Sequence, residues 1–71
     1  MVEAYTDNSG DVKMNKLLSR DRAKEVSEEL KKNGIPGKKI MYFGRGQINP
    51  IADNNTKNGR IQNRRVEITV K

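Results

Sequence analysis

The sequence predicts a small α+β domain in which one helix layer covers a small mixed sheet, in the order strand, helix, strand, strand. Three observations support this class. Residues 64–70 alternate between apolar and polar side chains, residues 20–33 carry apolar side chains at helical spacing, and residues 39–43 are almost continuously apolar. The first two strands and the helix between them make a right-handed parallel crossover, and the last strand is expected to run antiparallel.

The first strand is expected at residues 2–6, where Val2 and Ala4 face one side of the sheet. The polar stretch 7–11 ends this strand, because short polar side chains hydrogen-bond to their own backbone and favour turns.

The helix is expected at residues 20–33, with Ser19 as the N-cap that accepts a hydrogen bond from a free backbone amide. Its apolar stripe consists of Ala23, Val26 and Leu30. Gly34 suits the left-handed position that follows the last turn of many helices.

The second strand is expected at residues 39–43, after a turn at Pro36 and Gly37. Residues 44–63 form a long polar loop with room for a short turn of helix, and loops of this length are usually functional or mobile. In the last strand, at residues 64–70, the side chains Val66, Ile68 and Val70 share one face.

Size and composition limit what the chain can build. Its 71 residues are expected to form one domain, residues 1–71, and a chain of this size buries only about 60% of its unfolded surface. With 32% hydrophobic residues and three aromatic side chains, the core should be thin. No apolar stretch approaches the roughly 20 residues that span a bilayer, and the first residues do not resemble a signal peptide.

The net charge of +6 raises the alternative of a nucleic-acid-binding domain. The basic residues are scattered along the chain, however, and no aromatic stacking platform alternates with them. We therefore interpret the charge as a solvated surface and expect no nucleic-acid partner.

The residue types present favour binding over catalysis. The sequence has no histidine and no cysteine, which removes the commonest general base, the thiolate nucleophile and most zinc sites. Asp7 and Asp11 could suggest a pair of catalytic carboxylates, but turn formation and solvation account for them more simply. The sequence thus predicts no enzymatic activity, no metal and no cofactor.

A candidate ligand site lies where the first strand ends. Asp7 follows this strand, and Arg22 falls in the first turn of the predicted helix. Ligands gather at the carboxyl ends of the strands in such a crossover, where helix N-termini also point. Asp7 can hold an ammonium group, whereas Arg22 and free helix amides can hold a carboxylate. The pattern predicts a receptor for a zwitterion, and its alternative is an Asp7–Arg22 salt bridge that joins turn and helix.

Three blocks of sequence carry a resemblance to a known family. They are TDNSG at residues 6–10, N-x-x-L-S followed by R-A-x-x-V within residues 15–26, and NRRVEI at residues 63–68. In this order they resemble the OmpA C-terminal-like domain, the peptidoglycan-binding module shared by OmpA, Pal and MotB proteins. The resemblance covers nearly all of residues 2–70.

The resemblance implies roles for particular residues. In the family, the residues that match Asp7 and Arg22 hold the ammonium and carboxylate of diaminopimelate in the peptidoglycan stem peptide. It also implies that the side-chain amide of Asn15 contacts both the turn backbone and the ligand, and that Arg65 lies near the ligand. Thr6 and Asn8 flank Asp7 and are expected to contribute backbone amides.

Three further positions bear on the site. Adjacent side chains in a strand point to opposite faces, so only one of Arg64 and Arg65 can enter the site easily. Arg65 is preferred because the family resemblance places that arginine near the ligand, although it could equally serve to solubilise a sheet edge. Leu18 is expected in the core. Tyr5 stands where the family often has histidine.

The function implied is noncovalent peptidoglycan binding that anchors an outer-membrane or envelope protein to the cell wall, at the periplasmic face of the outer membrane. The alternatives are a basic nucleic-acid-binding or adaptor domain and a fragment that has lost ligand binding. Family members carry another strand and helix before the first strand seen here, so we expect an N-terminally truncated domain. Its exposed sheet edge is expected to support a homodimer.

Overall fold

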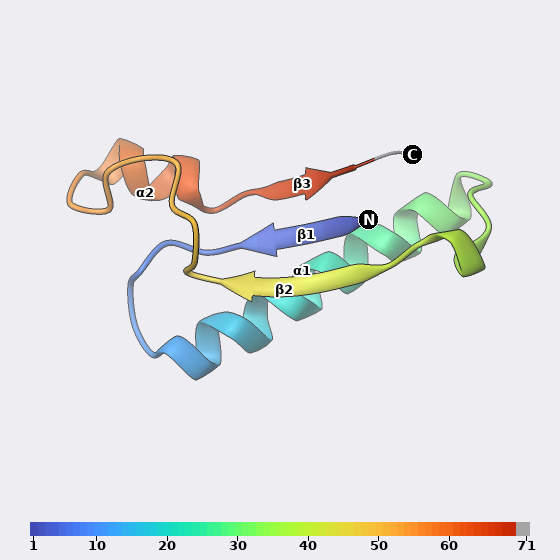
Figure 1. The fold of residues 1–71 in the computed structure, drawn as a ribbon, viewed down its shortest axis with the longest axis horizontal. Helices are drawn as coiled ribbons and strands as arrows, with labels where there is room; N and C mark the ends of the chain where they lie inside the picture. The colour runs from blue at the N-terminus through green and yellow to red at the C-terminus, as the bar shows by residue number, and fades with distance from the viewer. Residues whose placement is uncertain (70–71) are drawn as a thin grey trace.

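The structure, a computed structural model, describes residues 1–69, so that Val70 lies outside the described residues. The elements follow in the order β1 (Val2–Tyr5), α1 (Val12–Lys32), β2 (Tyr42–Gly46), α2 (Lys57–Asn63) and β3 (Val66–Ile68), with a short 3₁₀ turn at Gly37–Lys39 (Figure 1). The α+β class is confirmed, with α2 as a second helix.

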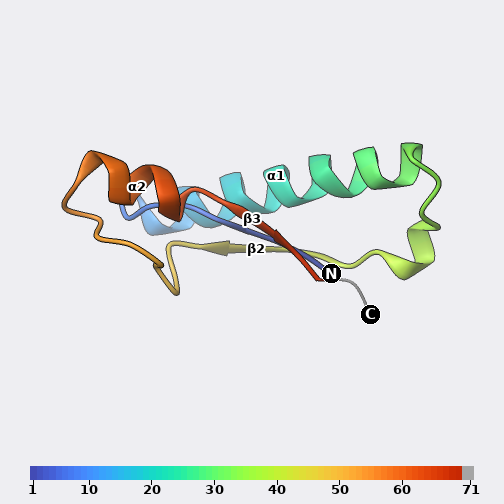
Figure 2. The same cartoon turned by 90° about the horizontal axis from the view of Figure 1, so that it is seen from above.

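The sheet is mixed, and β1 is its central strand. The strand order is β2-β1-β3, with β1 parallel to β2 and antiparallel to β3. This confirms the parallel first connection and the antiparallel last strand. Helix α1 runs along one face of the sheet, and α2 lies beyond the end where β1 stops and β3 begins (Figure 2).

The helix begins eight residues earlier than expected, so the predicted N-cap Ser19 is wrong. Asp11 caps α1 instead, because its Oδ1 accepts hydrogen bonds from the backbone amides of Lys13 at 2.8 Å and Met14 at 3.2 Å. The early turns escaped prediction because their buried positions are polar: the residues of α1 that face the sheet are Asn15, Ser19, Ala23 and Ser27.

Ser19 lies in the middle of α1 and joins it to β2. Its hydroxyl donates to the carbonyl of Lys16 at 2.8 Å and accepts from the amide of Gly46 at 2.9 Å. Opposite this point, a Cβ at Gly44 would overlap the backbone nitrogen of Arg20. Small helix residues and glycines in β2 therefore allow a close approach of helix and strand.

The C-terminus of α1 ends as the sequence predicts. Gly34 has a φ of 96°. Its amide donates to the carbonyl of Lys31 at 3.0 Å, and the amide of Ile35 donates to the carbonyl of Leu30 at 3.1 Å. These two bonds make a Schellman motif, which satisfies carbonyls that the helix leaves unpaired.

The second strand is shifted towards the C-terminus relative to the prediction of residues 39–43. Lys39 belongs to the 3₁₀ turn, and β2 continues to Gly46. The glycines that suggested a loop are part of the sheet, since Gly44 pairs with Ala4 and Gly46 pairs with Tyr5. Gly44 is needed because α1 leaves no room for a side chain there, whereas Gly46 has a φ of 62°, which favours glycine.

The predicted loop 44–63 contains helix α2, whose N-cap Thr56 accepts from the amide of Gly59 at 2.9 Å. Buried Asn63 at the end of α2 then fixes the preceding loop. Its Oδ1 accepts from the amides of Ile51 and Ala52, and its Nδ2 donates to Ala52 O and to Asn54 Oδ1. Because α2 extends to Asn63, β3 is shorter than the predicted strand 64–70.

The core is thin, as composition predicts. Its fully buried members are Val2, Ala4 and Ala23, packed by the partly buried Val26, Leu30, Ile40, Tyr42 and Val66. Leu18 does not join it: the side chain is 57% exposed, so the expected core position is wrong. It lies on the flank of α1, one position before buried Ser19.

The sheet face opposite α1 is covered by charged side chains. Arg45 lies over the ring of Phe43 at 4.6 Å and pairs with Glu3 at 2.8 Å. Arg65 lies over the ring of Tyr5 at 3.9 Å and pairs with Glu67 at 2.7 Å. Cation–π and ionic contacts of this kind shield aromatic rings while leaving the face compatible with water.

Replacing Gly44 with alanine is expected to lower the free energy of unfolding by roughly 1–3 kcal/mol, because the new methyl group forces α1 away from β2. Urea unfolding followed by circular dichroism measures the change. Gly37→Ala is the matched control, since a Cβ there meets only the flexible end of the Lys31 side chain. Equal stability of the two variants would contradict the close approach.

Candidate functional site

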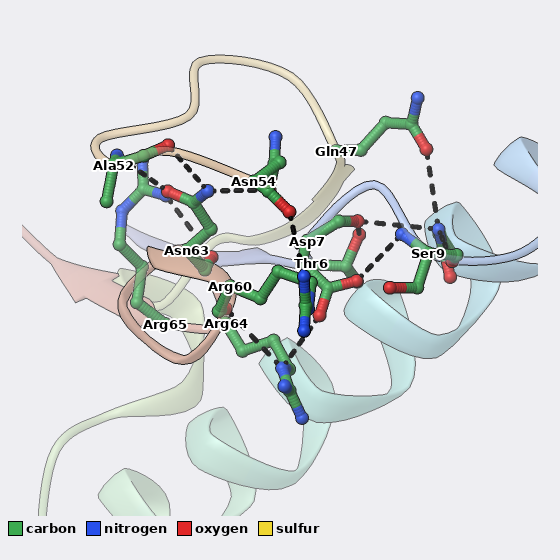
Figure 3. Close-up of polar contacts among 11 residues, drawn as sticks. Thr6, Asp7, Ser9, Gln47, Ala52, Asn54, Arg60, Asn63, Arg64 and Arg65 are labelled. Carbon is green, nitrogen blue, oxygen red and sulfur yellow. Dashed lines mark hydrogen bonds and ion pairs between the residues drawn. The ribbon is translucent and has the colours of Figure 1, made fainter. Parts of the chain in front are cut away.

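Asp7 is a buried carboxylate at the point where β1 ends. Its Oδ1 accepts from the amide of Ser9 at 2.8 Å, and its Oδ2 pairs with Nε of Arg64 at 2.9 Å (Figure 3). The hydroxyl of Thr6 donates to the carbonyl of Asp7 at 2.8 Å. These contacts hold the turn after β1 and fix the direction of the carboxylate.

The pKa of Asp7 lies below its ordinary value. The largest cause is the hydrogen bond from the backbone amide of Ser9, which favours the charged form, while burial acts in the opposite direction. The positive charges of Arg64 and Arg60 lower the pKa further. Asp7 is therefore a negatively charged group near neutral pH, suited to a cation.

Asn15 connects the turn to α1. Its Nδ2 donates to the carbonyl of Ser9 at 2.8 Å and makes longer contacts with the carbonyl of Asp7 at 3.5 Å and with Oε1 of Gln47 at 3.4 Å. The predicted contact with the turn backbone is thus present. Since the side chain is buried, its first role is to position the loop that carries Asp7.

A hollow of about 580 Å³ opens beside Asp7 on the flank of α1. Four of the predicted site residues line it: Thr6, Asp7, Asn15 and Arg22. The other lining residues are Tyr5, Ser9, Leu18, Ser19, Asp21, Glu25 and Arg64. The structure therefore places the acidic and basic members of the predicted pair around one cavity.

Arg22 occupies a different position on the helix from the one expected. Because α1 begins at Val12, Arg22 lies in its interior, and the amides of the first turn are far along the helix and bonded to Asp11. The predicted contribution of free helix amides to the site is wrong. Among residues 1–69 the ion pair of Asp7 is with Arg64, so the alternative of an Asp7–Arg22 salt bridge is not realised.

Arg64, not Arg65, reaches the carboxylate of Asp7. Arg65 stacks on Tyr5 and donates to the carbonyl of Asn49 at 2.9 Å, outside the lining of the hollow. Alternation along a strand could not rank the two arginines, because Arg64 is the C-cap of α2 and precedes β3. Asn8 is exposed and also lies outside the lining.

Tyr5 is one of the residues that line the hollow, and its hydroxyl donates to Oε2 of Glu3 at 3.4 Å. Burial raises the pKa of this phenol, and the negative charges of Glu3 and Glu67 add to the effect. The side chain is therefore neutral near pH 7, and its ring is covered by Arg65.

A second hollow, of about 500 Å³, lies on the other flank of α1 beside β2 and contains none of the predicted site residues. It is lined by Lys16, Arg20 and Arg45 together with aromatic and apolar side chains. The aromatic ring of Phe43 is already covered by Arg45.

Within the described range, residues 1–69, no group of three or more acidic side chains is placed to hold a metal ion. In the same range no helix is both long and apolar enough to cross a membrane. The first hollow offers opposite charges, since the fixed carboxylate of Asp7 and the exposed Arg22 both line it.

The structure is an α+β domain with a hollow lined by charged side chains at the end of its central strand. The chain belongs to the OmpA family, whose sequence model matches residues 1–64. This confirms the family expected from the sequence blocks.

Several relatives resemble nearly the whole chain. Peptidoglycan-binding protein ArfA of Mycobacterium tuberculosis is 48% identical over 69 residues, which are 97% of this chain and 21% of that protein. Probable lipoprotein YiaD of Escherichia coli is 45% identical, and outer-membrane lipoprotein YfiB of Pseudomonas aeruginosa is 44% identical, each across 97% of this chain. The chain spans 32% of YiaD and 41% of YfiB.

The charge of Asp7 is expected to stabilise the fold in a pH-dependent way. A lowered pKa in the folded state contributes stability above the unfolded carboxyl pKa of about 3.9, and this contribution is lost as the pH falls through the folded-state value. Asp7→Asn should therefore lower the free energy of unfolding by about 1–2 kcal/mol at pH 7.

The difference between wild type and Asp7→Asn should shrink as the pH falls below the unfolded carboxyl pKa of about 3.9 and through the lower folded-state pKa of Asp7, because the wild-type carboxylate then becomes protonated. Urea unfolding at a series of pH values measures it. Asp21→Asn serves as the control, because Asp21 is exposed on α1. A difference that stays constant from neutral to acid pH would contradict the assignment of a charged Asp7.

Proposed function

We propose that this domain binds peptidoglycan noncovalently and thereby anchors an outer-membrane or envelope protein to the cell wall, at the periplasmic face of the outer membrane. Membership of the OmpA family and the similarity to a peptidoglycan-binding protein support the proposal. So does the similarity to proteins named as outer-membrane proteins and lipoproteins. The role is one of binding, without catalysis.

The observation that carries the proposal is the placement of Asp7 and Arg22 around one hollow. A carboxylate and a guanidinium set apart in this way complement an ammonium and a carboxylate on one ligand. Diaminopimelate in the peptidoglycan stem peptide offers both groups at its free end. The ammonium is assigned to Asp7, and the carboxylate is assigned to Arg22.

Direct ligand contacts are further assigned to Thr6 and Asn15, since both line the hollow. Ligand contacts from Asn8 and Arg65 stay predictions from the family resemblance. Weak individual contacts suffice for anchoring, because the wall is a polymeric lattice and several tethered domains raise the overall avidity.

Loss of either charge should weaken binding to purified sacculi. Asp7→Asn is expected to reduce the affinity more than tenfold, because removing one member of a desolvated charge pair costs roughly 2–5 kcal/mol. Arg22→Gln should have a smaller effect in the same direction, since Arg22 is exposed. Cosedimentation with sacculi measures both.

Lys24→Gln is the matched control for Arg22→Gln, because Lys24 is an exposed cation on the same helix outside the lining of the hollow. Sacculi whose free stem ammonium has been acylated should bind poorly to the wild type. If both variants and the acylated wall retain full binding, the assigned site is wrong. Stronger binding to DNA than to sacculi would favour the nucleic-acid alternative.

We also propose that two copies associate through an exposed sheet edge. Both β2 and β3 are edge strands of the described sheet, and Ile68 of β3 is 52% exposed. Unpaired strand edges form hydrogen bonds with other strands, and burying an apolar side chain adds to the gain.

Replacing Ile68 with lysine is expected to shift the dimer to monomer, because an edge lysine opposes strand pairing. Sedimentation velocity over a dilution series measures the shift. Thr69→Lys adds the same charge at the next exposed position and serves as the comparison. A wild type that is monomeric at every concentration would contradict this proposal.

A further inference from the structure

The outer oxygen of Asp7 already has a cationic partner supplied by the chain itself. Nε of Arg64 lies 2.9 Å from Oδ2 of Asp7, while Oδ1 is held by the amide of Ser9. Arg64 extends from the end of α2 across to the turn after β1 (Figure 3). The guanidinium thus occupies the oxygen of Asp7 that the backbone amide of Ser9 leaves open.

The two members of this pair differ greatly in exposure. The side chain of Asp7 is 9% exposed, whereas that of Arg64 is 49% exposed. The carboxylate is therefore covered, and Arg64 forms the outer side of the cover. Arg64 can return to water because its own side chain is half exposed, but the buried carboxylate of Asp7 then needs another cation.

On these grounds we propose that Arg64 is a specificity-determining residue of the site, an intramolecular cation that a ligand ammonium must replace at Asp7. This inference rests on the proposed function. It assigns Arg64 a role that differs from that of Arg22, which lines the same hollow and has no ion pair within residues 1–69.

The exchange determines which ligands bind well. A ligand that offers only an ammonium replaces one cation by another at Asp7 and gains little. A ligand that carries a carboxylate beside its ammonium gains the contact with Arg22 as well, and that additional contact makes replacement favourable. The displaced state is only part of the free-protein population, so the apparent affinity for every cation is reduced by the fraction of the protein in that state.

Two small probes separate these contributions: diaminopimelate, and diaminopentane, which has the same chain of carbons between its ammonium groups but no carboxylates. Nuclear magnetic resonance titration of the wild type should show binding of diaminopimelate. The Nε–H signal of Arg64 should move to the position of a solvated arginine as it binds. Diaminopentane should bind far more weakly.

Arg64→Gln opens Asp7 and should raise the affinity for diaminopentane roughly two- to fivefold, the effect of removing an exposed ionic competitor. The preference for diaminopimelate over diaminopentane should become correspondingly smaller. Arg64→Lys keeps a cation and should resemble the wild type. Lys57→Gln removes a charge from the exposed start of α2 and controls for net charge.

Circular dichroism and an increase in the pKa of Asp7 verify that Arg64→Gln folds and has lost the ion pair. If the wild type binds diaminopimelate and sacculi but Arg64→Gln binds diaminopentane no better, the exchange is overturned and the proposed function stands. A wild type that binds neither diaminopimelate nor sacculi overturns the proposed function, and the exchange with it.

Discussion

The contact between α1 and β2 passes through backbone and small side chains, and the positions of the other elements follow from it. The hydroxyl of Ser19 accepts a hydrogen bond from the amide of Gly46, while Gly44 leaves room for the backbone of Arg20. Because α1 is held this close to β2, the position of its flank relative to the sheet is fixed. That flank carries Arg22, and the sheet it borders ends at Asp7, so the spacing of helix and strand sets the distance across the hollow.

The other side of the hollow depends on polar bonding in the second half of the chain. Buried Asn63 holds the loop before α2 through four hydrogen bonds, and the residue after it is Arg64. The position of the Arg64 guanidinium is thus determined by an amide that makes no contact with the hollow itself. Asn15 plays the corresponding role for the Asp7 turn. Neutral side chains thus position the charged ones: Asn63 holds the segment that carries Arg64, and Asn15 holds the turn that carries Asp7.

Local patterns in the sequence were sufficient where the structure is locally determined. Strand alternation identified β1, helical spacing identified the second half of α1, and Gly34 marked its end. The first half of α1 lacks an apolar stripe because it faces glycine-rich β2, so periodicity missed it and only the capping potential of Asp11 remained as a signal. Likewise α2 contains a glycine and only one large apolar residue, and without that helix the two adjacent arginines could not be told apart. Asp7, Arg22, Thr6 and Asn15 line one hollow, whereas Asn8 and Arg65 lie outside its lining, and contact of any of them with a ligand stays a prediction.

The small residues between helix and sheet have a consequence for how the domain responds to temperature. The heat-capacity change of unfolding grows with the apolar area that becomes exposed, and polar area reduces it. A helix face built from Asn15, Ser19, Ala23 and Ser27 buries little apolar area for its length. The curve of stability against temperature should therefore be shallow, so that the free energy of unfolding changes only slightly between cool and warm conditions. A domain of this kind would keep a nearly constant, modest stability over a wide range of growth temperatures.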